Sequence, residues 1–454
     1  MSAPMSALNP RILRIELRRS SASAVGGLVA LLGVAGLYLL FTTHQGDLWD
    51  TQWTLLVTFE RIMLVLLWPL SLGAGAWQAR RDRRSRMVEL LATTPRPVPL
   101  RVLSSAAAMA ICVVLGYLLI LAAGAVRVAG NTAYQQLDWL PIAGVGALSL
   151  VAASWLGMGI GRLLPSGYTP PLLVVAGFLV LMAPIQFGKT GSPGALGLLV
   201  PNLSKKLDEY STISGSVSLA QAVWFGALAV SGLLLFMLTR RGALVAVVPA
   251  VAGLVAASTM LSGAPADGIV ADPGAAAEVC TTDGGPAVCM TSVHAQGLSR
   301  MTGPARRALK LLAVLPDAPT SVHEVTSYRA GAQPAGEIWV HSDNFAVSQG
   351  ESDDQVVVRM LAGAGTRLCD RPDGTGIADD YRVRRLAAAW LYGAYPAPGQ
   401  SGPGNARVSP EEADAWRQLK ALPEPEQVRR IAAVRRAGFT CQGDLRAALA
   451  GGAS

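Results

Sequence analysis

Four cysteines in the second half of the chain are the residues whose type and spacing point most clearly to covalent chemistry. Cys280 and Cys289 flank the turn sequence Asp283-Gly-Gly, which suits a β-hairpin closed by a disulfide. Cys369 and Cys441 remain as a second pair that would tie together the two ends of a helical region. Zinc binding is the alternative, but a Cys-x-x-Cys spacing is missing, and an even set in one region favours an oxidising compartment. We therefore expect two disulfides and no metal site.

Histidine and glycine motifs give no catalytic site. His323-Glu324 begins the His-Glu-x-x-His pattern of zinc peptidases, but the second histidine is missing. His294 and His341 could join His323 in the fold, although isolated surface histidines are more common. The string Gly188-Lys-Thr resembles the end of a phosphate-binding loop, but an alanine stands where that loop requires its first glycine. We expect no catalytic residue, no cofactor and no enzymatic activity.

Hydrophobic segments determine where these residues can lie. Only 15% of the 454 residues are charged, against roughly 25% in soluble proteins, and the mean hydropathy is +0.39. A hydrocarbon layer ~30 Å thick needs about 20 apolar residues in a helix. Stretches that qualify lie at 23–42, 55–77, 102–126, 139–162, 169–187, 219–238 and 243–262. The sequence predicts an α-helical polytopic membrane protein of the cell membrane, with about seven transmembrane helices in a domain over 1–262.

Basic residues predict the orientation of these helices. Arginines precede the first span and follow the second, fourth and sixth spans. Short loops rich in Lys and Arg stay in the cytoplasm. The net charge of +8 therefore reflects membrane topology, and we expect no nucleic acid partner. A cytoplasmic N-terminus and seven crossings would place the chain after about residue 263 outside the cell.

The remaining residues predict a separate extracytoplasmic domain. A segment rich in Pro, Asp and Gly at 263–277 indicates a linker, and 278–454 is long enough for its own core. We expect a mixed, mostly α domain that acts as a binding or substrate-gating module. Helical patterns occur at 299–315, 352–368, 379–394 and 409–437, and strand patterns at 321–328 and 337–341.

Small and charged residues inside the membrane half raise two further questions. Glycines such as Gly157, Gly159 and Gly161 allow helices to approach closely, although a general Ala/Gly bias of the sequence explains them equally well. Glu60 and Arg61 begin the second span. They could line a substrate path, but we favour snorkelling anchors that reach the outer interface.

The segment between the second and third spans is the most informative for function. Residues 78–101 start with a basic run, continue with Met87, Leu90 and Leu91 at helical spacing, and reach a stop at Pro95. This pattern predicts a short amphipathic helix at the cytoplasmic surface. Glu89 lies beside the apolar stripe and could meet a positive group on a partner. The alternative is a basic loop that touches anionic membrane lipid.

The string from Arg86 to Pro95, with Glu89-Leu-Leu at its centre, resembles the permease subunits of ABC-2 type transporters. In that family a charged segment after the second helix forms the coupling helix that docks into the ATPase. The resemblance implies a separate ABC ATPase subunit that binds ATP, and a dimeric permease assembly. The family usually has six helices, whereas a seventh is expected here. By resemblance, the coupling residues are Arg81, Arg84, Arg86, Glu89, Leu90 and Pro95.

Three functions are compatible with this pattern. The first is the permease of an ATP-driven exporter, coupled through 78–101. The second is a membrane anchor, without transport, for an external sensory or binding domain. The third is an external hydrolase, for which the sequence offers no reactive site. A partner ATPase would separate the first two.

Overall fold

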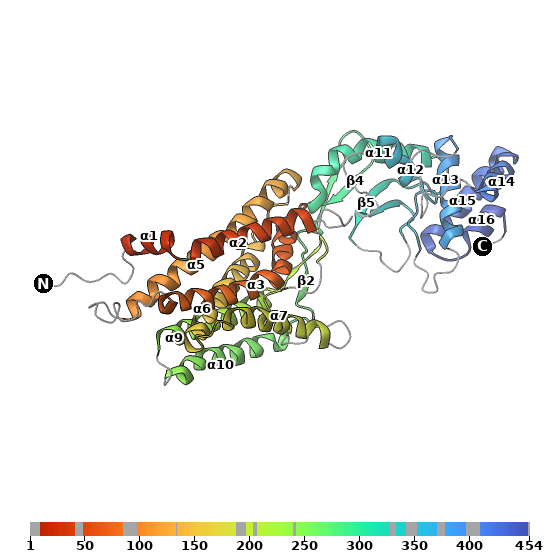
Figure 1. Ribbon diagram of the computed structural model, residues 1–454. Coiled ribbons are helices and arrows are strands. Elements are labelled where there is room, and N and C mark those ends of the chain that lie inside the picture. Colours follow the sequence, from red (N-terminus) through yellow and green to blue (C-terminus); the bar gives the residue numbers. More distant parts are fainter. Residues whose placement is uncertain are drawn as a thin grey trace. The chain divides into compact units, whose positions relative to one another are not determined.

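The chain divides into two compact units in the computed structural model, Met1–Asp272 and Pro273–Ser454, which we call the membrane unit and the C-terminal unit. In Figure 1 the colours follow the sequence, from red at the start of the membrane unit to blue at the end of the C-terminal unit. Each unit is described by itself. The structure describes residues 10–40, 49–84, 98–132, 134–187, 197–202, 207–238, 242–326, 333–341, 352–369, 377–395 and 409–452.

The membrane unit is a bundle of apolar helices (Figure 1). Six helices in the described residues are long and apolar enough to cross a membrane, which makes the chain a membrane protein. The seventh expected span, 169–187, forms helix α7, whose described side chains, Thr169–Ala183, make a shorter apolar helix than the other six. The structure thus supports six spans, and the seventh stays a prediction. The helices are α1 (Pro10–Arg19), α2 (Ala22–Ala35) with η1 (Gly36–Leu40), α3 (Trp53–Arg84), α5 (Val98–Asn131), α6 (Trp139–Leu163), α7 (Thr169–Phe187), α9 (Gly215–Met237), α10 (Ala243–Met260) and η4 (Leu261–Gly263).

Helix α3 packs against α2, α5, α6 and α7, and glycines bring the backbones together. A Cβ atom on Gly157 of α6 would lie 1.9 Å from the Leu72 carbonyl oxygen of α3. A Cβ on Gly75 of α3 would lie 2.0 Å from the Ser154 carbonyl oxygen of α6. Real Cβ atoms cannot approach so closely, so the small residues are required by helix packing here. Gly144, by contrast, has open space where a Cβ would lie.

A short two-stranded ribbon belongs to the membrane unit. Strand β1 (Ser211–Ile213) pairs antiparallel with β2 (Ile269–Ala271). Part of the segment expected to be a linker, 263–277, is therefore paired with the chain that precedes α9. Asp272 ends this ribbon: its N–H donates to the Tyr210 carbonyl (2.7 Å), and its carboxylate accepts from the Tyr134 hydroxyl (2.9 Å).

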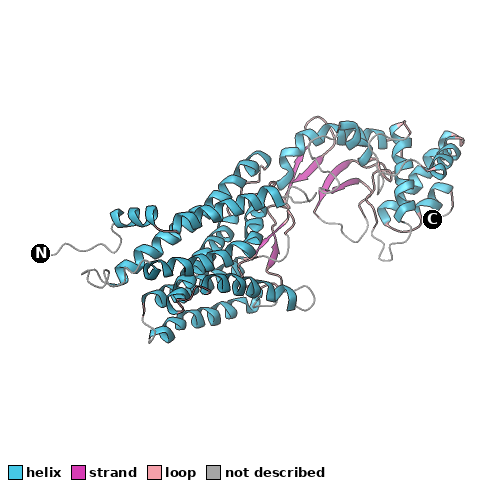
Figure 2. Cartoon of the chain, viewed as in Figure 1, coloured by secondary structure: helices cyan, strands magenta, loops and turns pink. Residues whose placement is uncertain are grey.

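The C-terminal unit combines a sheet with helices, as Figure 2 shows. Its four strands follow the order β3-β4-β5-β6, with β3 and β4 antiparallel and the other neighbours parallel. The strands expected within 321–328 and at 337–341 are confirmed as β5 and β6. The elements are β3 (Glu278–Thr281), β4 (Val288–Thr291), η5 (Ser292–Gly297), α11 (Leu298–Leu312), β5 (Ser321–Val325), β6 (Glu337–His341), α12 (Asp353–Met360), α13 (Ile377–Tyr392), α14 (Pro410–Lys420), α15 (Glu424–Thr440) and α16 (Leu445–Ala450).

One face of this sheet builds the core. Side chains alternate along β5 and β6, so that Val322 and Ile338 are buried in one cluster with Leu309 and Leu312 of α11. The helix expected over 409–437 is instead two helices, α14 and α15. Pro423 has extended backbone (ψ 146°) immediately before α15, which interrupts the helical hydrogen bonds there.

Two disulfides join the cysteine pairs expected from the sequence. Cys280 and Cys289 are directly opposite each other in the β3–β4 hairpin, with Cα atoms 4.0 Å apart. Cys369 bonds to Cys441, which caps α15 in a left-handed conformation (φ 55°), over a sequence separation of 72 residues. The second bridge ties the segment after α12 to the end of α15.

Candidate functional site

The residues predicted to couple to an ATPase fall at the limit of the described structure. Arg81 and Arg84 lie in the last turn of α3, which continues as a helix past the apolar part of the span that ends at Arg80. Their side chains, and the whole of Arg86, Glu89, Leu90 and Pro95, lie outside the described residues. The coupling role therefore stays a prediction.

The structure draws attention instead to Glu60 and Arg61, whose exposed fractions are 1% and 0%. Trp53, which begins α3, stacks on Trp139 with ring centroids 5.5 Å apart, an aromatic pair of the kind that marks a membrane interface. Glu60 follows Trp53 by seven residues, which places it about 10 Å farther along the helix. The interpretation as snorkelling anchors is wrong, because both side chains point into the bundle.

Arg61 is bonded to carbonyl groups from three other segments. Its Nε donates to the Pro201 carbonyl (2.6 Å), one terminal nitrogen donates to Gln221 Oε1 (3.0 Å), and the other reaches the Ile142 carbonyl (3.5 Å). Gln221 in turn donates to the Leu198 carbonyl (2.6 Å). The guanidinium therefore joins α3 to α6, α9 and the segment 197–202. No carboxylate of the described residues forms an ion pair with it.

Glu60 has a different environment although it is the next residue. Both of its carboxyl oxygens are buried and have no hydrogen-bond partner among the described residues. The Tyr117 hydroxyl of α5 lies beside this carboxyl, but without hydrogen-bond geometry, and it is also unpartnered. Gly146 of α6 makes room for the tyrosine, because a Cβ there would lie 2.4 Å from the Tyr117 hydroxyl. Glu60 and Tyr117, with Arg61 beside them, form the polar cluster that we regard as the candidate site.

Tyr117 and Gln221 were missed in the sequence. A signal was available, because Tyr117 is the one tyrosine within the apolar stretch 102–126 and Gln221 is the one amide side chain within 219–238. Polar side chains inside membrane helices are rare and usually face the protein interior.

The C-terminal unit also buries a carboxylate, that of Glu324, but both of its oxygens have hydrogen-bond partners. Glu324 accepts from the Thr291 backbone N–H (2.7 Å) and the Thr291 hydroxyl (2.8 Å), and its other oxygen lies 2.6 Å from His294 Nδ1. Burial opposes the negative charge, but the bonds from His294 and Thr291 outweigh it and hold the pKa of Glu324 below its ordinary value. This arrangement stabilises the end of β4.

The histidines expected to be isolated have partners of their own. His323 Nδ1 lies 3.3 Å from Glu278 Oε1, and Nε2 lies 3.1 Å from the Ser321 hydroxyl. The described group with metal-binding spacing is Glu278 with Cys280 and Cys289. Both sulfur atoms of that group are used in the disulfide, so it is not a metal site.

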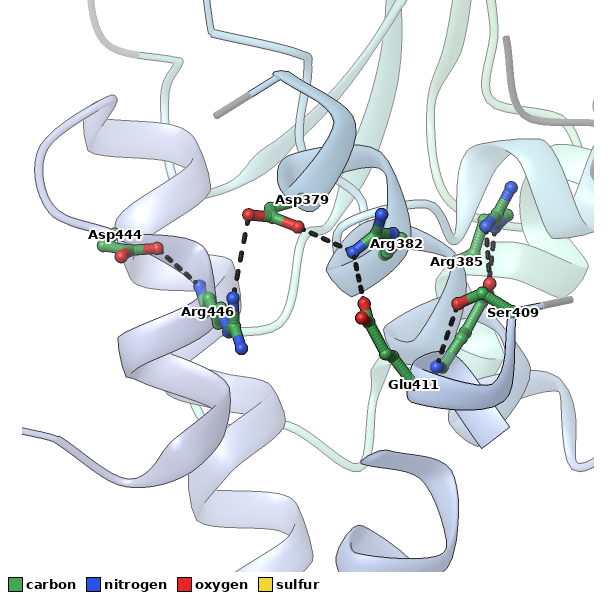
Figure 3. A network of polar contacts seen from close by, with 8 residues as sticks. Asp379, Arg382, Arg385, Ser409, Glu411, Asp444 and Arg446 are labelled. Carbon is green, nitrogen blue, oxygen red and sulfur yellow. Dashed lines mark hydrogen bonds and ion pairs between the residues drawn. The ribbon is translucent and has the colours of Figure 1, made fainter. Parts of the chain in front are cut away.

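Figure 3 shows a further polar network, between α13, α14 and α16. Arg382 binds Asp379 (2.9 Å) and Glu411 (3.0 Å), and both acids are well exposed. Arg385 holds the buried Glu412 by two hydrogen bonds, at 2.6 and 3.0 Å. Asp379, Glu411 and Glu412 pair with arginine side chains, and Asp444 caps α16 by accepting from the Arg446 backbone N–H, which indicates helix packing, not chemistry.

The fold defines a polytopic membrane protein with a mixed C-terminal unit, and its candidate site is the buried cluster in the helix bundle. The chain matches no protein-family model, and it shows no significant similarity to a curated protein or to a solved structure. Any function has to be argued from the molecule itself.

Proposed function

We propose that this protein is the permease subunit of an ATP-driven ABC-2 type transporter, an exporter that is coupled to a separate ATPase through residues 78–101. The observation that carries the proposal is the continuity of α3. This helix runs from Trp53, at one end of the span, through the basic residues to Arg84 without a break. A displacement of the basic segment would therefore move the helix that packs against α2, α5, α6 and α7.

The mechanism follows from this connection. ATP binding would close the ATPase dimer, which would shift the segment 78–101, and α3 would transmit the shift to the bundle. The free energy of ATP binding thus selects between two packings of the helices. A dimer of permease subunits would line the path. The ATP is bound by the partner, and this chain supplies the coupling residues Arg81, Arg84, Arg86, Glu89, Leu90 and Pro95.

The topology that goes with this function has a cytoplasmic N-terminus and an extracytoplasmic C-terminal unit. The arginine-rich segments before the first span and after the second, fourth and sixth spans support their placement in the cytoplasm. The two disulfides of the C-terminal unit support an oxidising compartment for it. A reporter protein fused after Ser454 tests this placement, since activity in the cytosol would contradict it.

The substitution Glu89→Lys tests the coupling role. The full chain would be purified from its native membrane and its companions identified, and ATP hydrolysis by the copurified ATPase would be measured in lipid. We expect the Glu89→Lys protein to insert normally into the membrane. The stimulated rate of ATP hydrolysis should fall by about tenfold or more, because a positive charge replaces the negative charge that would face the ATPase. Asp138→Lys, a charge reversal immediately before α6, is the matched control and should keep it.

A second function is favoured by the C-terminal unit itself, which has its own hydrophobic core and two disulfides. In this alternative the helices anchor an external sensory or binding domain and transport nothing. Copurification without an ATPase, or unchanged hydrolysis in Glu89→Lys, would favour the anchor over the transporter.

A further inference from the structure

Glu60 is the described group of the membrane unit whose burial is hardest to explain by packing alone. Its exposed fraction is 1%, and neither of its oxygens accepts a hydrogen bond within the described part of the chain. An ionised carboxylate in such surroundings would lose its hydration without compensation, a far larger cost than that of burying a neutral acid. The surroundings therefore select the neutral form.

Arg61 does not form an ion pair with Glu60. Its donors are directed to the carbonyl oxygens of Pro201 and Ile142 and to the side chain of Gln221, so they are already bonded. Neighbouring residues of a helix also project about 100° apart and do not face each other. The described residues contain no ion pair between Glu60 and Arg61.

We propose that the Glu60 carboxyl binds a proton within the packed membrane unit and releases it to water when α3 separates from α5. The Tyr117 hydroxyl, on the facing side of α5, is the polar group against which the carboxyl lies. Protonation adds one O–H to Glu60 and removes its charge, and release restores the carboxylate. The inference concerns the membrane unit alone and does not depend on an ATPase.

A proton fits this site better than a metal cation does. Metal cations bind several oxygen ligands at once, whereas the unpartnered oxygens that lie beside each other here are those of Glu60 and Tyr117; a further one, Asn202 Oδ1, belongs to the residue after Pro201. A proton needs a single oxygen and no cavity.

Few other titratable groups face α3 from the elements packed against it. Helix α7 carries none in its sequence, and α2 carries none. Tyr38 of η1 donates to the Ala123 carbonyl (2.8 Å), and Arg162 of α6 donates to the Phe236 carbonyl. On α5 the further groups with described side chains are Cys112, which packs against Gly26, and Arg127, which pairs with Asp50 at 3.5 Å; the Arg101 side chain lies outside the described residues. Glu60 is therefore the acid whose ionisation responds to the separation of α3 from α5.

Infrared spectroscopy of the full chain in lipid tests this directly. Exposed carboxyl groups are ionised at neutral pH, so a C=O stretching band of a protonated acid at neutral pH reports a buried one. We expect this band in the wild type, its disappearance in alkali, and its loss at neutral pH in Glu60→Gln. Tyr117→Phe is the matched control, because it keeps the acid and removes its neighbour, and its band should persist at a shifted frequency.

Three results would overturn the proposal. One is a wild-type spectrum at neutral pH without the band, for which no variant is needed. Another is a band that persists in Glu60→Gln. The third is a band that fades at constant pH as sodium or potassium is added, because the site would then hold a metal cation.

Thermal unfolding gives an independent measure, followed by tryptophan fluorescence. Over the pH range in which Glu60 is protonated in the packed unit and ionised in the unfolded chain, the packed unit binds one more proton than the unfolded chain. The stability of the packed unit therefore falls as pH rises through this range. The melting temperature of the wild type should fall in alkali more than that of Glu60→Gln. Equal slopes in the two proteins would contradict the proposal.

Discussion

Each unit of the molecule buries a glutamate, and the two glutamates differ in the hydrogen bonds that their carboxyl groups receive. Glu324 in the C-terminal unit receives hydrogen bonds from Thr291 and lies against His294, whereas Glu60 in the membrane unit receives none within the described residues. The first arrangement holds an ionised group in one geometry, which is useful for a rigid structure. The second leaves an acid that can change its charge when the packing changes, which is useful for a moving one.

The rest of each unit follows the same contrast. Directed bonds and disulfides hold the C-terminal unit, as in the arginine network of Figure 3. The membrane unit has one cysteine, the buried and free Cys112, and its helices meet through glycines such as Gly157. Helices held by close contact can slide past one another, whereas Arg61 also ties α3 to α6 and α9 through hydrogen bonds. The comparison therefore predicts more motion between helices of the membrane unit, such as α3 and α5, than within the C-terminal unit.

Removal of the Cys369–Cys441 bridge should have the largest effect. The bridge closes a loop of 72 residues, and the loss of such a constraint on the unfolded chain costs about 4 kcal/mol. We expect the double variant Cys369→Ser with Cys441→Ser to raise hydrogen exchange in α13 and α15 and to leave the membrane helices unchanged. The bridge Cys280–Cys289, with a separation of 9 residues, should matter less. Equal effects of the two would contradict the loop argument.

Glu324→Ala should come next. It leaves the Thr291 N–H and hydroxyl and His294 without their buried acceptor, which costs about 3 kcal/mol. Hydrogen exchange along β4 and β5 in the full chain measures the loss. Glu278→Ala is the control, because the Glu278 side chain is 50% exposed, and it should change little.

The same residue gives the C-terminal unit a dependence on pH. Because the pKa of Glu324 is lowered in the folded unit, the unfolded chain takes up a proton first as pH falls. The stability that Glu324 provides is present above the ordinary pKa of a glutamate and is lost as pH falls through the lowered value. In Glu324→Gln the stability of the C-terminal unit should fall less steeply as pH falls. The slope has the opposite direction to the alkaline loss expected for Glu60.

Gly157→Ala should have the smallest effect of the three, about 2 kcal/mol, and in the membrane unit only. The new methyl group would overlap the Leu72 carbonyl oxygen, so that α3 and α6 must move apart. Thermal stability in detergent measures the change. Gly144→Ala on the same helix is the matched control, since open space surrounds it. If both variants behaved alike, the glycines would reflect composition and not close packing.

The sequence predicts what depends on local pattern. Apolar runs, the alternation along 337–341 and the pairing of Cys280 with Cys289 are properties of one segment or of two adjacent strands. The direction of the Glu60 side chain is not such a property. A glutamate eight residues into a span can reach the interface or the bundle. The structure places Glu60 in the bundle beside Tyr117, for which Gly146 of α6 leaves room.

Two smaller differences have similar causes. Strand β2 was expected to be linker because its pairing partner, β1, precedes it by more than fifty residues. The division of 409–437 at Pro423, by contrast, was readable, since proline is poorly tolerated inside a helix. The coupling residues Arg86, Glu89, Leu90 and Pro95 lie outside the described residues, so their role still depends on the family resemblance.

The β1–β2 ribbon determines how tension on residue 273 would enter the bundle. A pull there would first load the three backbone pairs of the ribbon and the Tyr134–Asp272 contact, and only afterwards the C-terminal end of α10. The last membrane helix is thereby protected from extraction, and the load passes to the chain leading into α9.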